Sequence, residues 1–177
     1  FTTTGKGWHN LKQQNDKHLM DFEPVDALQS RETARWLQLG VLSLGLAGLF
    51  AVLLVLSRIP GAESFFPWVD FFRIALVVHV DQSVLIWFLA MAGVVWSLVI
   101  PAGTSWLLVQ RSAFGLALAG TLGIALSAFV GDGAPLMNNY VPLLQRHFFF
   151  WSVGIFALGT GLQSMLAFTS ARGVFGA

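Results

Sequence analysis

The chain has 177 residues, of which 55% are hydrophobic and 11% are charged, and its mean hydropathy is +0.69. Soluble domains carry about twice that share of charged residues, so we expect a membrane protein. The net charge of +1 argues against a nucleic-acid partner, and the lack of cysteine excludes disulfides, thiolate metal sites, iron–sulfur clusters and covalent c-type heme attachment.

Residues 1–35 form a polar extension in which basic and acidic side chains are interspersed. Pro24 suits the first turn of a helix, because that position needs no backbone N–H donor. The segment that follows Val25 contains few helix-breaking residues, so we expect its helix to continue into the first apolar block. We interpret the charges of the extension as a solvated surface.

Four apolar blocks follow, each about as long as a helix that crosses a hydrocarbon core of about 30 Å. Within a membrane domain of residues 36–172, we place the transmembrane spans at about 36–59, 71–100, 112–130 and 143–169. Pro60 and Pro101 end the first two blocks, because proline interrupts a helix. The predicted fold class is therefore all-α, an integral membrane bundle of about four helices.

The helices can associate through small residues, which let backbones approach closely in lipid. Two candidate faces recur in the sequence, Gly115 with Ala119 and Gly123 in the third span, and Gly154 with Ala157 and Gly161 in the fourth. The alternative is that membrane helices are simply rich in glycine and alanine.

Basic side chains near the spans indicate the orientation, because cytoplasmic segments carry an excess of them. Lys17, Arg31, Arg35, Arg111 and Arg172 lie on the N-terminal side of the spans, and Arg58, Arg73 and Arg146 lie on the other side. This modest excess predicts that the N-terminus, with its polar extension, lies in the cytoplasm.

The second span holds His79 and Asp81 about eight to ten residues inside it. An ionisable side chain at this depth costs about 2.5–3.5 kcal/mol on insertion scales, so it needs a partner or a cavity. Neutral imidazole survives burial and binds iron through one ring nitrogen, which makes His79 a candidate heme ligand. A hydrogen-bonded packing histidine is the alternative. Asp81 could orient the His79 ring without itself binding the iron, or it could pair with Arg73.

Two segments resemble subunit I of the heme-copper oxidases, the superfamily of cytochrome c oxidases, quinol oxidases and nitric oxide reductases. Residues Phe72 to Val80 and Ser83 to Ala90, with His79 among them, look like its second transmembrane helix, and Asn139 to Leu144 with His147, Phe148 and Phe149 look like the entry to its fourth. The resemblance implies that the chain corresponds to the first four helices of that subunit. It also implies that His79 is an axial ligand of a low-spin heme b, near the outer side of the membrane.

The other metal ligands of that family sit on later helices, so we expect no copper in this chain. Its four histidines are His9, His18, His79 and His147, and the first two lie in the polar extension. His147 is a weaker candidate for a second heme ligand, because it should lie shallower than His79 by a turn or more. An interfacial residue beside Arg146 is the alternative for it.

We therefore expect a subunit of a respiratory electron-transfer complex in a bacterial-type inner membrane, in contact with lipid and with other membrane subunits. The chain is not a complete oxidase by itself, and whether it forms part of an enzyme stays open. The alternative is a heme-free accessory subunit that packs against a larger complex. Because the first residue is Phe1, we also expect that the gene product is longer.

Overall fold

A computed structural model describes residues 25–61, 70–101, 104–137 and 141–175 of the chain. Among them are four helical runs that are long and apolar enough to cross a membrane. They are α2 (Val25–Leu56), the continuous run of α3 (Phe71–Val80), the π-helix η2 (Asp81–Ile86) and α4 (Trp87–Val99), then α5 (Thr104–Leu126) and α6 (His147–Phe175). The predicted all-α membrane bundle is confirmed, and its helices place the protein in a lipid bilayer.

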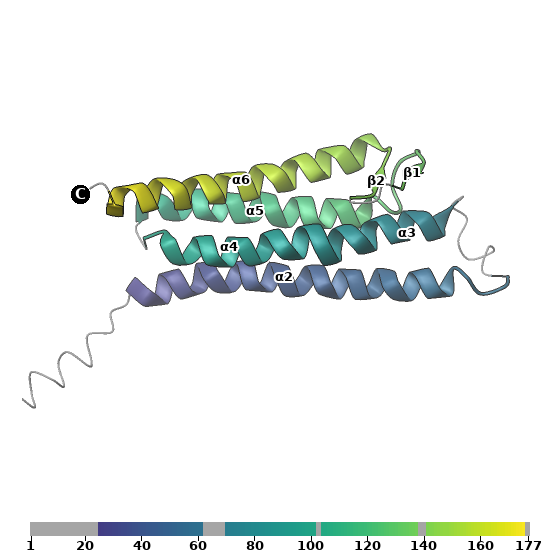
Figure 1. Ribbon diagram of the computed structural model, residues 1–177, viewed down its shortest axis with the longest axis horizontal. Helices are drawn as coiled ribbons and strands as arrows, with labels where there is room; N and C mark the ends of the chain where they lie inside the picture. Colours follow the sequence, from purple (N-terminus) through teal and green to yellow (C-terminus); the bar gives the residue numbers. More distant parts are fainter. Residues whose placement is uncertain (1–24, 62–69, 102–103, 138–140, 176–177) are drawn as a thin grey trace, which may run out of the picture.

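The helices lie side by side, and successive spans run in opposite directions (Figure 1). We use the name amino end for the end of the bundle at which α2 and α5 begin and α4 and α6 finish. The opposite end, where α3 and α6 begin, is the hairpin end. The most extensive contacts join α5 to α6, followed by those between α2 and α4. The bundle is therefore two helix pairs, which meet mainly where α4 packs against α6.

The predicted continuation of the first helix from Val25 is confirmed, because α2 is unbroken over 32 residues. Residues 1–24 of the polar extension lie outside the described residues. Glu32 in α2 is buried, accepts a hydrogen bond from Arg35 at 2.6 Å and lies 3.7 Å from the Arg111 guanidinium of α5. The interpretation of these charges as a solvated surface is thus wrong at Glu32, which links two helices.

The helix that contains the third predicted span begins at Thr104, eight residues before the predicted start of the span at residue 112. Arg111, which directly precedes the predicted span, lies inside α5. Its side chain is 49% exposed, and its guanidinium lies near Glu32. A long aliphatic stem lets the charged end of an arginine reach the surface while the helix continues past it.

A two-stranded hairpin precedes the fourth span and was absent from the sequence prediction. β1 (Pro135–Leu136) pairs with β2 (Leu143–Leu144) in antiparallel register, so α6 begins at His147 and not at residue 143. Gly133 adopts a φ of 146°, a conformation that residues with a Cβ rarely adopt. The hairpin turns Leu144 into the core, where it is fully buried.

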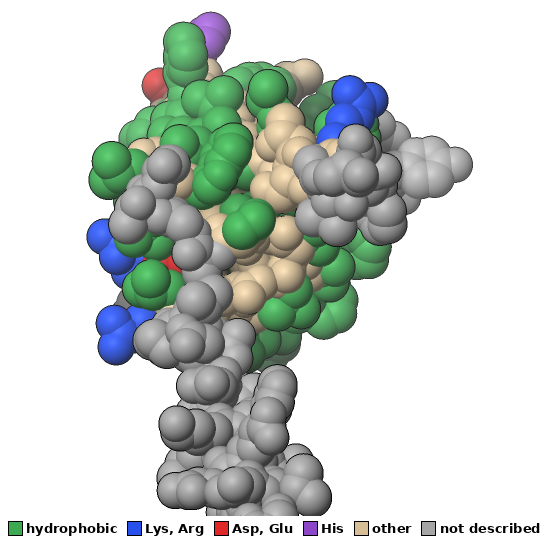
Figure 2. All heavy atoms as spheres, turned by 90° about the vertical axis from the view of Figure 1, so that its left-hand side faces the viewer, with side chains coloured by type: hydrophobic (Ala, Val, Ile, Leu, Met, Phe, Trp, Pro, Cys, Tyr) green, Lys and Arg blue, Asp and Glu red, His purple; other side chains and the backbone are tan. Residues whose placement is uncertain are grey.

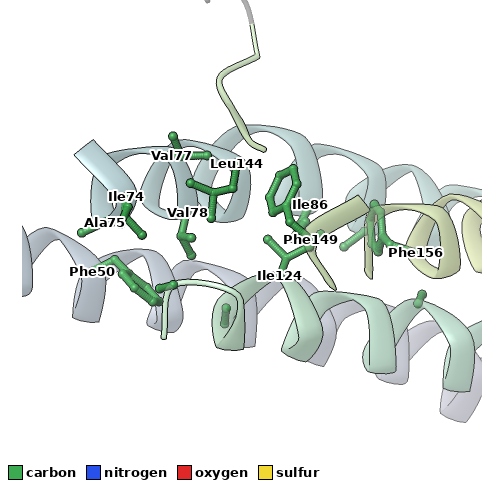
Figure 3. Close-up of a cluster of buried hydrophobic side chains, with 14 of the residues drawn as sticks. Phe50, Ile74, Ala75, Val77, Val78, Ile86, Ile124, Leu144, Phe149 and Phe156 are labelled. Carbon is green, nitrogen blue, oxygen red and sulfur yellow. The ribbon is translucent and has the colours of Figure 1, made fainter. Parts of the chain in front are cut away.

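The apolar core lies toward the hairpin end and joins every span (Figure 3). Its labelled members are Phe50 of α2; Ile74, Ala75, Val77, Val78 and Ile86 of the second span; Ile124 of α5; Leu144 of β2; and Phe149 and Phe156 of α6. Large apolar side chains also cover the outside, including Phe88 at 67% exposed and Trp151 at 73%. An exterior of this kind is suited to contact with lipid.

The described arginines are distributed between the two ends nearly as the sequence suggested. Arg31, Arg35, Arg111 and Arg172 lie at the amino end, and Arg58, Arg73 and Arg146 lie at the hairpin end. Figure 2 views the amino end and shows basic side chains at its margin. Lys17 lies outside the described residues. The amino end therefore has four described arginines and the hairpin end has three, and the cytoplasmic location of the amino end stays a prediction.

Candidate functional site

The second span changes its helical winding at its centre, where the chemistry-bearing residues lie. Over Asp81–Ile86 the helix is a π-helix, and the Trp87 backbone N–H donates to the carbonyl of Gln82, five residues earlier. Single turns of π-helix within α-helices are frequent at functional sites. His79 lies two residues before this segment, and Asp81 and Gln82 open it.

His79 is held by a main-chain carbonyl of the neighbouring helix. Its Nδ1 lies 2.9 Å from the carbonyl oxygen of Ala47 in α2. A carbonyl oxygen can only accept, so Nδ1 carries the proton and donates it, and Nε2 is left with a free lone pair. Within the described ranges Nε2 has no hydrogen-bond partner. The ring is half-buried, in the tautomer that binds a metal through Nε2.

The surface of α2 next to this contact is open. Gly48 follows Ala47 and is exposed, and a Cβ added to it would meet no heavy atom within 4 Å. An oriented imidazole with a free Nε2 can bind the iron of a heme through one axial position. The donor set near His79 therefore fits half of a low-spin heme site.

Asp81 points away from His79, and it neither orients that ring nor pairs with Arg73. The carbonyl of Ala47, and not Asp81, contacts His79, while Arg73 donates to Asp70 at 3.4 Å. Two residues along a helix turn a side chain by about 200°, so Asp81 lies on the opposite face from His79. Its carboxyl is buried, and neither oxygen has a hydrogen-bond partner among the residues that the structure describes.

Two glutamines inside the bundle were missed by the sequence analysis. The Nε2 of Gln82 donates to the Thr121 carbonyl of α5 at 3.0 Å, whereas its Oε1 has no partner in the described part of the chain. The same holds for both side-chain polar atoms of Gln163 in α6, which is fully buried. Polar atoms of this kind are normally satisfied by buried water. The available signal was an amide residue deep within an apolar block.

His147 is the first residue of α6, is exposed and lies far from the His79 ring. Gln82 contacts Thr121 of α5, and the neighbouring Gly120 of α5 packs against Phe156 of α6. These two contacts align the second span with α6. In that alignment His147 lies about five residues, or about 8 Å, nearer to the hairpin end than His79 does. The ring of His79 faces α2, whereas α6 packs chiefly along α5. The structure does not bring the two histidines together.

The described residues contain no group of three histidines, aspartates or glutamates that could hold a metal ion directly. His9 and His18 fall outside the described residues. Among the described residues, His79 is therefore the candidate ligand for a metal-containing group, and it would supply one ligand.

Replacing Asp81 with leucine should stabilise the bundle by about 1–3 kcal/mol, because it removes a buried polar group that has no partner. The free energy of unfolding can be measured by denaturant titration in detergent. Asp81→Asn is the matched control, since it keeps a polar group of the same shape and should give no such gain. A loss of stability in Asp81→Leu would contradict the unpartnered placement of this carboxyl.

Comparisons with known proteins give relatives without a stated activity. No family model and no solved structure matches the chain. An uncharacterized protein of Rickettsia prowazekii (strain Madrid E), RP382, is 34% identical over 145 residues, which cover 70% of this chain and 28% of the relative. An uncharacterized protein of Aquifex aeolicus (strain VF5) is 35% identical over 130 residues, with 73% and 32% covered. The chain spans about three tenths of the length of these relatives.

Proposed function

We propose that this chain is a membrane subunit of a redox complex and that His79 binds a b-type heme through Nε2. The proposal rests mainly on the 2.9 Å contact of Nδ1 with the Ala47 carbonyl. That contact fixes the ring orientation and the tautomer, as outer hydrogen bonds do for metal-binding histidines.

The position of His79 adds support, because an ionisable side chain inside a transmembrane helix is a functional candidate by default. A heme bound here would supply one-electron transfer. The second axial ligand would come from outside the described bundle, as the resemblance to the first four helices of heme-copper oxidase subunit I implies.

The proposed setting follows from the same resemblance. The chain would lie in a bacterial-type inner membrane, with its amino end in the cytoplasm and with other membrane subunits, or further helices, against its exposed apolar surface. The arginines of the amino end support this orientation, since basic residues concentrate on the cytoplasmic side.

The test is the optical spectrum of the purified full chain after heme is added, recorded as reduced minus oxidised. We expect a Soret band and the bands of a b-type heme, because an oriented imidazole with a free Nε2 is available. His79→Ala should abolish them. His147→Ala is the matched control, since it also removes one imidazole but from an exposed site, and it should leave the spectrum unchanged.

A colourless wild-type sample would refute heme binding by the chain. So would a His79→Ala variant that keeps the full spectrum, or a His147→Ala variant that loses it. The far-UV circular dichroism of each variant separates the loss of a ligand from a loss of the fold.

A heme-free accessory subunit is the second candidate. It is favoured by one observation, namely that the described residues bring only one free ring nitrogen into the bundle, whereas a low-spin heme needs two ligands. In that case His79 simply ties the second span to α2. The same spectrum separates the candidates, because an accessory subunit would stay colourless under all conditions.

A further inference from the structure

A groove with a volume of about 550 Å³ runs along the outside of the bundle between α4 and α6, near the amino end. Trp96 and Val99 of α4 line one side, and Met165, Phe168 and Ala171 of α6 line the other. Met165 is 64% exposed and Phe168 is 58% exposed, so the groove opens toward the membrane. Its apolar lining suits a hydrocarbon chain.

A cation lies beside this groove, stacked on Phe168, which lines it. Arg172 is exposed, and the carbon of its guanidinium lies 4.3 Å from the centroid of the Phe168 ring. Cation–π contact of this kind orients an arginine and leaves its N–H donors available. Arg172 is also the last residue of the fourth apolar span, which puts it at the level of the lipid headgroups.

The groove lies within the depth of one leaflet, whose hydrocarbon region is about 15 Å thick. From Ala171 to Ser164 the groove follows α6 for about 10 Å, from the membrane surface into the acyl-chain region. Trp96 faces the groove from α4, and tryptophan is enriched at this depth. The occupant must therefore join an anionic head at the surface to an apolar tail below it.

We propose that this groove binds one anionic phospholipid, with the phosphate on Arg172 and an acyl chain against Phe168 and Trp96. Basic residues at the ends of transmembrane helices recognise anionic headgroups in this way. Arg31, Arg35 and Arg111 lie at the same end of the bundle and add to the positive potential there. The site is independent of the proposed heme, because Trp96 lies 17 residues, or about 25 Å, further along the second span than His79.

The experiment uses the full chain in nanodiscs of phosphatidylcholine that contain a photoactivatable phosphatidylglycerol, with crosslinked peptides identified by mass spectrometry. Crosslinks should concentrate on α6 near Met165 and Phe168 and on α4 near Trp96. One surface cation favours an anionic lipid about five-fold, so an equal amount of photoactivatable phosphatidylcholine should label these peptides about five-fold less. Raising the ionic strength should reduce the difference.

The chain offers a matched control for the cation. Arg58, at the hairpin end, also stacks on a phenyl ring, with its guanidinium carbon 4.1 Å from the Phe72 centroid. Arg172→Gln should remove the preference for phosphatidylglycerol at the groove, whereas Arg58→Gln should leave it unchanged. Ala171→Trp fills the groove without a change of charge and should lower the labelling by both lipids.

Three results would overturn the proposal. One is labelling spread evenly along α6, and another is an equal effect of Arg58→Gln and Arg172→Gln. The third is the absence of lipid labelling near Met165 and Trp96, which would mean that a second copy or another helix covers the groove.

Discussion

Gly159→Leu should lower the free energy of unfolding by about 3 kcal/mol, at the upper end of what overpacking usually costs. A Cβ at this position would lie 2.5 Å from the backbone nitrogen of Ala117 and 2.6 Å from the carbonyl oxygen of Ala113 in α5. Backbone atoms cannot rotate away as a side chain can. The two helices would have to separate, and their contact is the most extensive in the bundle.

Gly154→Leu is the control, because it places the same side chain on the same helix. A Cβ at Gly154 would meet no heavy atom within 4 Å, so the leucine would extend toward lipid. Leucine also favours a helix more than glycine does, by about 0.5–1 kcal/mol, so this variant should match or exceed the wild-type stability. The free energies of unfolding of the two variants can be compared by denaturation in detergent, monitored by circular dichroism. Equal losses would contradict the proposed α5–α6 contact.

The glycines show why helix packing could not be read from residue spacing. The sequence suggested two small-residue faces, yet Gly115, Gly154 and Gly161 have open space where a Cβ would be. Close approach occurs at Gly120 and Gly159 instead, and of the suggested residues only Gly123 is tightly packed, against Ser152. In lipid, both faces of a helix are apolar, so hydrophobic periodicity does not reveal which face is buried.

The elements themselves were largely predictable, because long apolar runs need a helix to satisfy their backbone in lipid. The residues at which the helices begin and end were less predictable. Thr104 begins α5 ahead of Arg111, whose long side chain reaches the surface from inside the helix. The hairpin at Leu143 and Leu144 has two-residue strands, too short for any alternation of apolar and polar residues.

The candidate site was predictable only in part. The sequence indicated His79 because an ionisable residue stands out in an apolar run. Its partner could not be identified, since a carbonyl such as that of Ala47 carries no side-chain signal. The direction of Asp81 depends on the helix rotation and on the π-helical turn that begins there, and neither follows from residue types.

Arg146 forms the buried polar contact that closes the hairpin end. It is 5% exposed, and its Nη1 donates to the Ser127 carbonyl at 2.5 Å and to the Ala128 carbonyl at 3.3 Å. Its Nε donates to the Gly133 carbonyl at 3.3 Å. Burial lowers the pKa of Arg146, and the negative charge of Asp132 opposes that shift. The carbonyls that follow a helix end lack intrahelical partners, so the guanidinium caps α5.

Arg146→Met should therefore lower the free energy of unfolding by about 3 kcal/mol, because it leaves several buried carbonyls without a donor. Arg146→Lys keeps the charge but not the planar fork of donors, so its loss should be intermediate. Arg73→Met is the control, since that arginine is exposed and its contact with Asp70 is worth less than about 1 kcal/mol. Denaturant unfolding in detergent measures all three.

Hydrogen exchange can locate the effect of Arg146→Met. Amide protection should fall first over residues 127–136, whose fold the guanidinium holds, while the amino-end half of α2 keeps its protection, because it packs against α4. Leu144 lies two residues before Arg146 and is fully buried in the same core as Val77 and Val78. Loosening the hairpin should thus reach the helix that carries His79. If Arg146→Met and Arg73→Met lose stability equally, the hairpin is held by its apolar contacts alone.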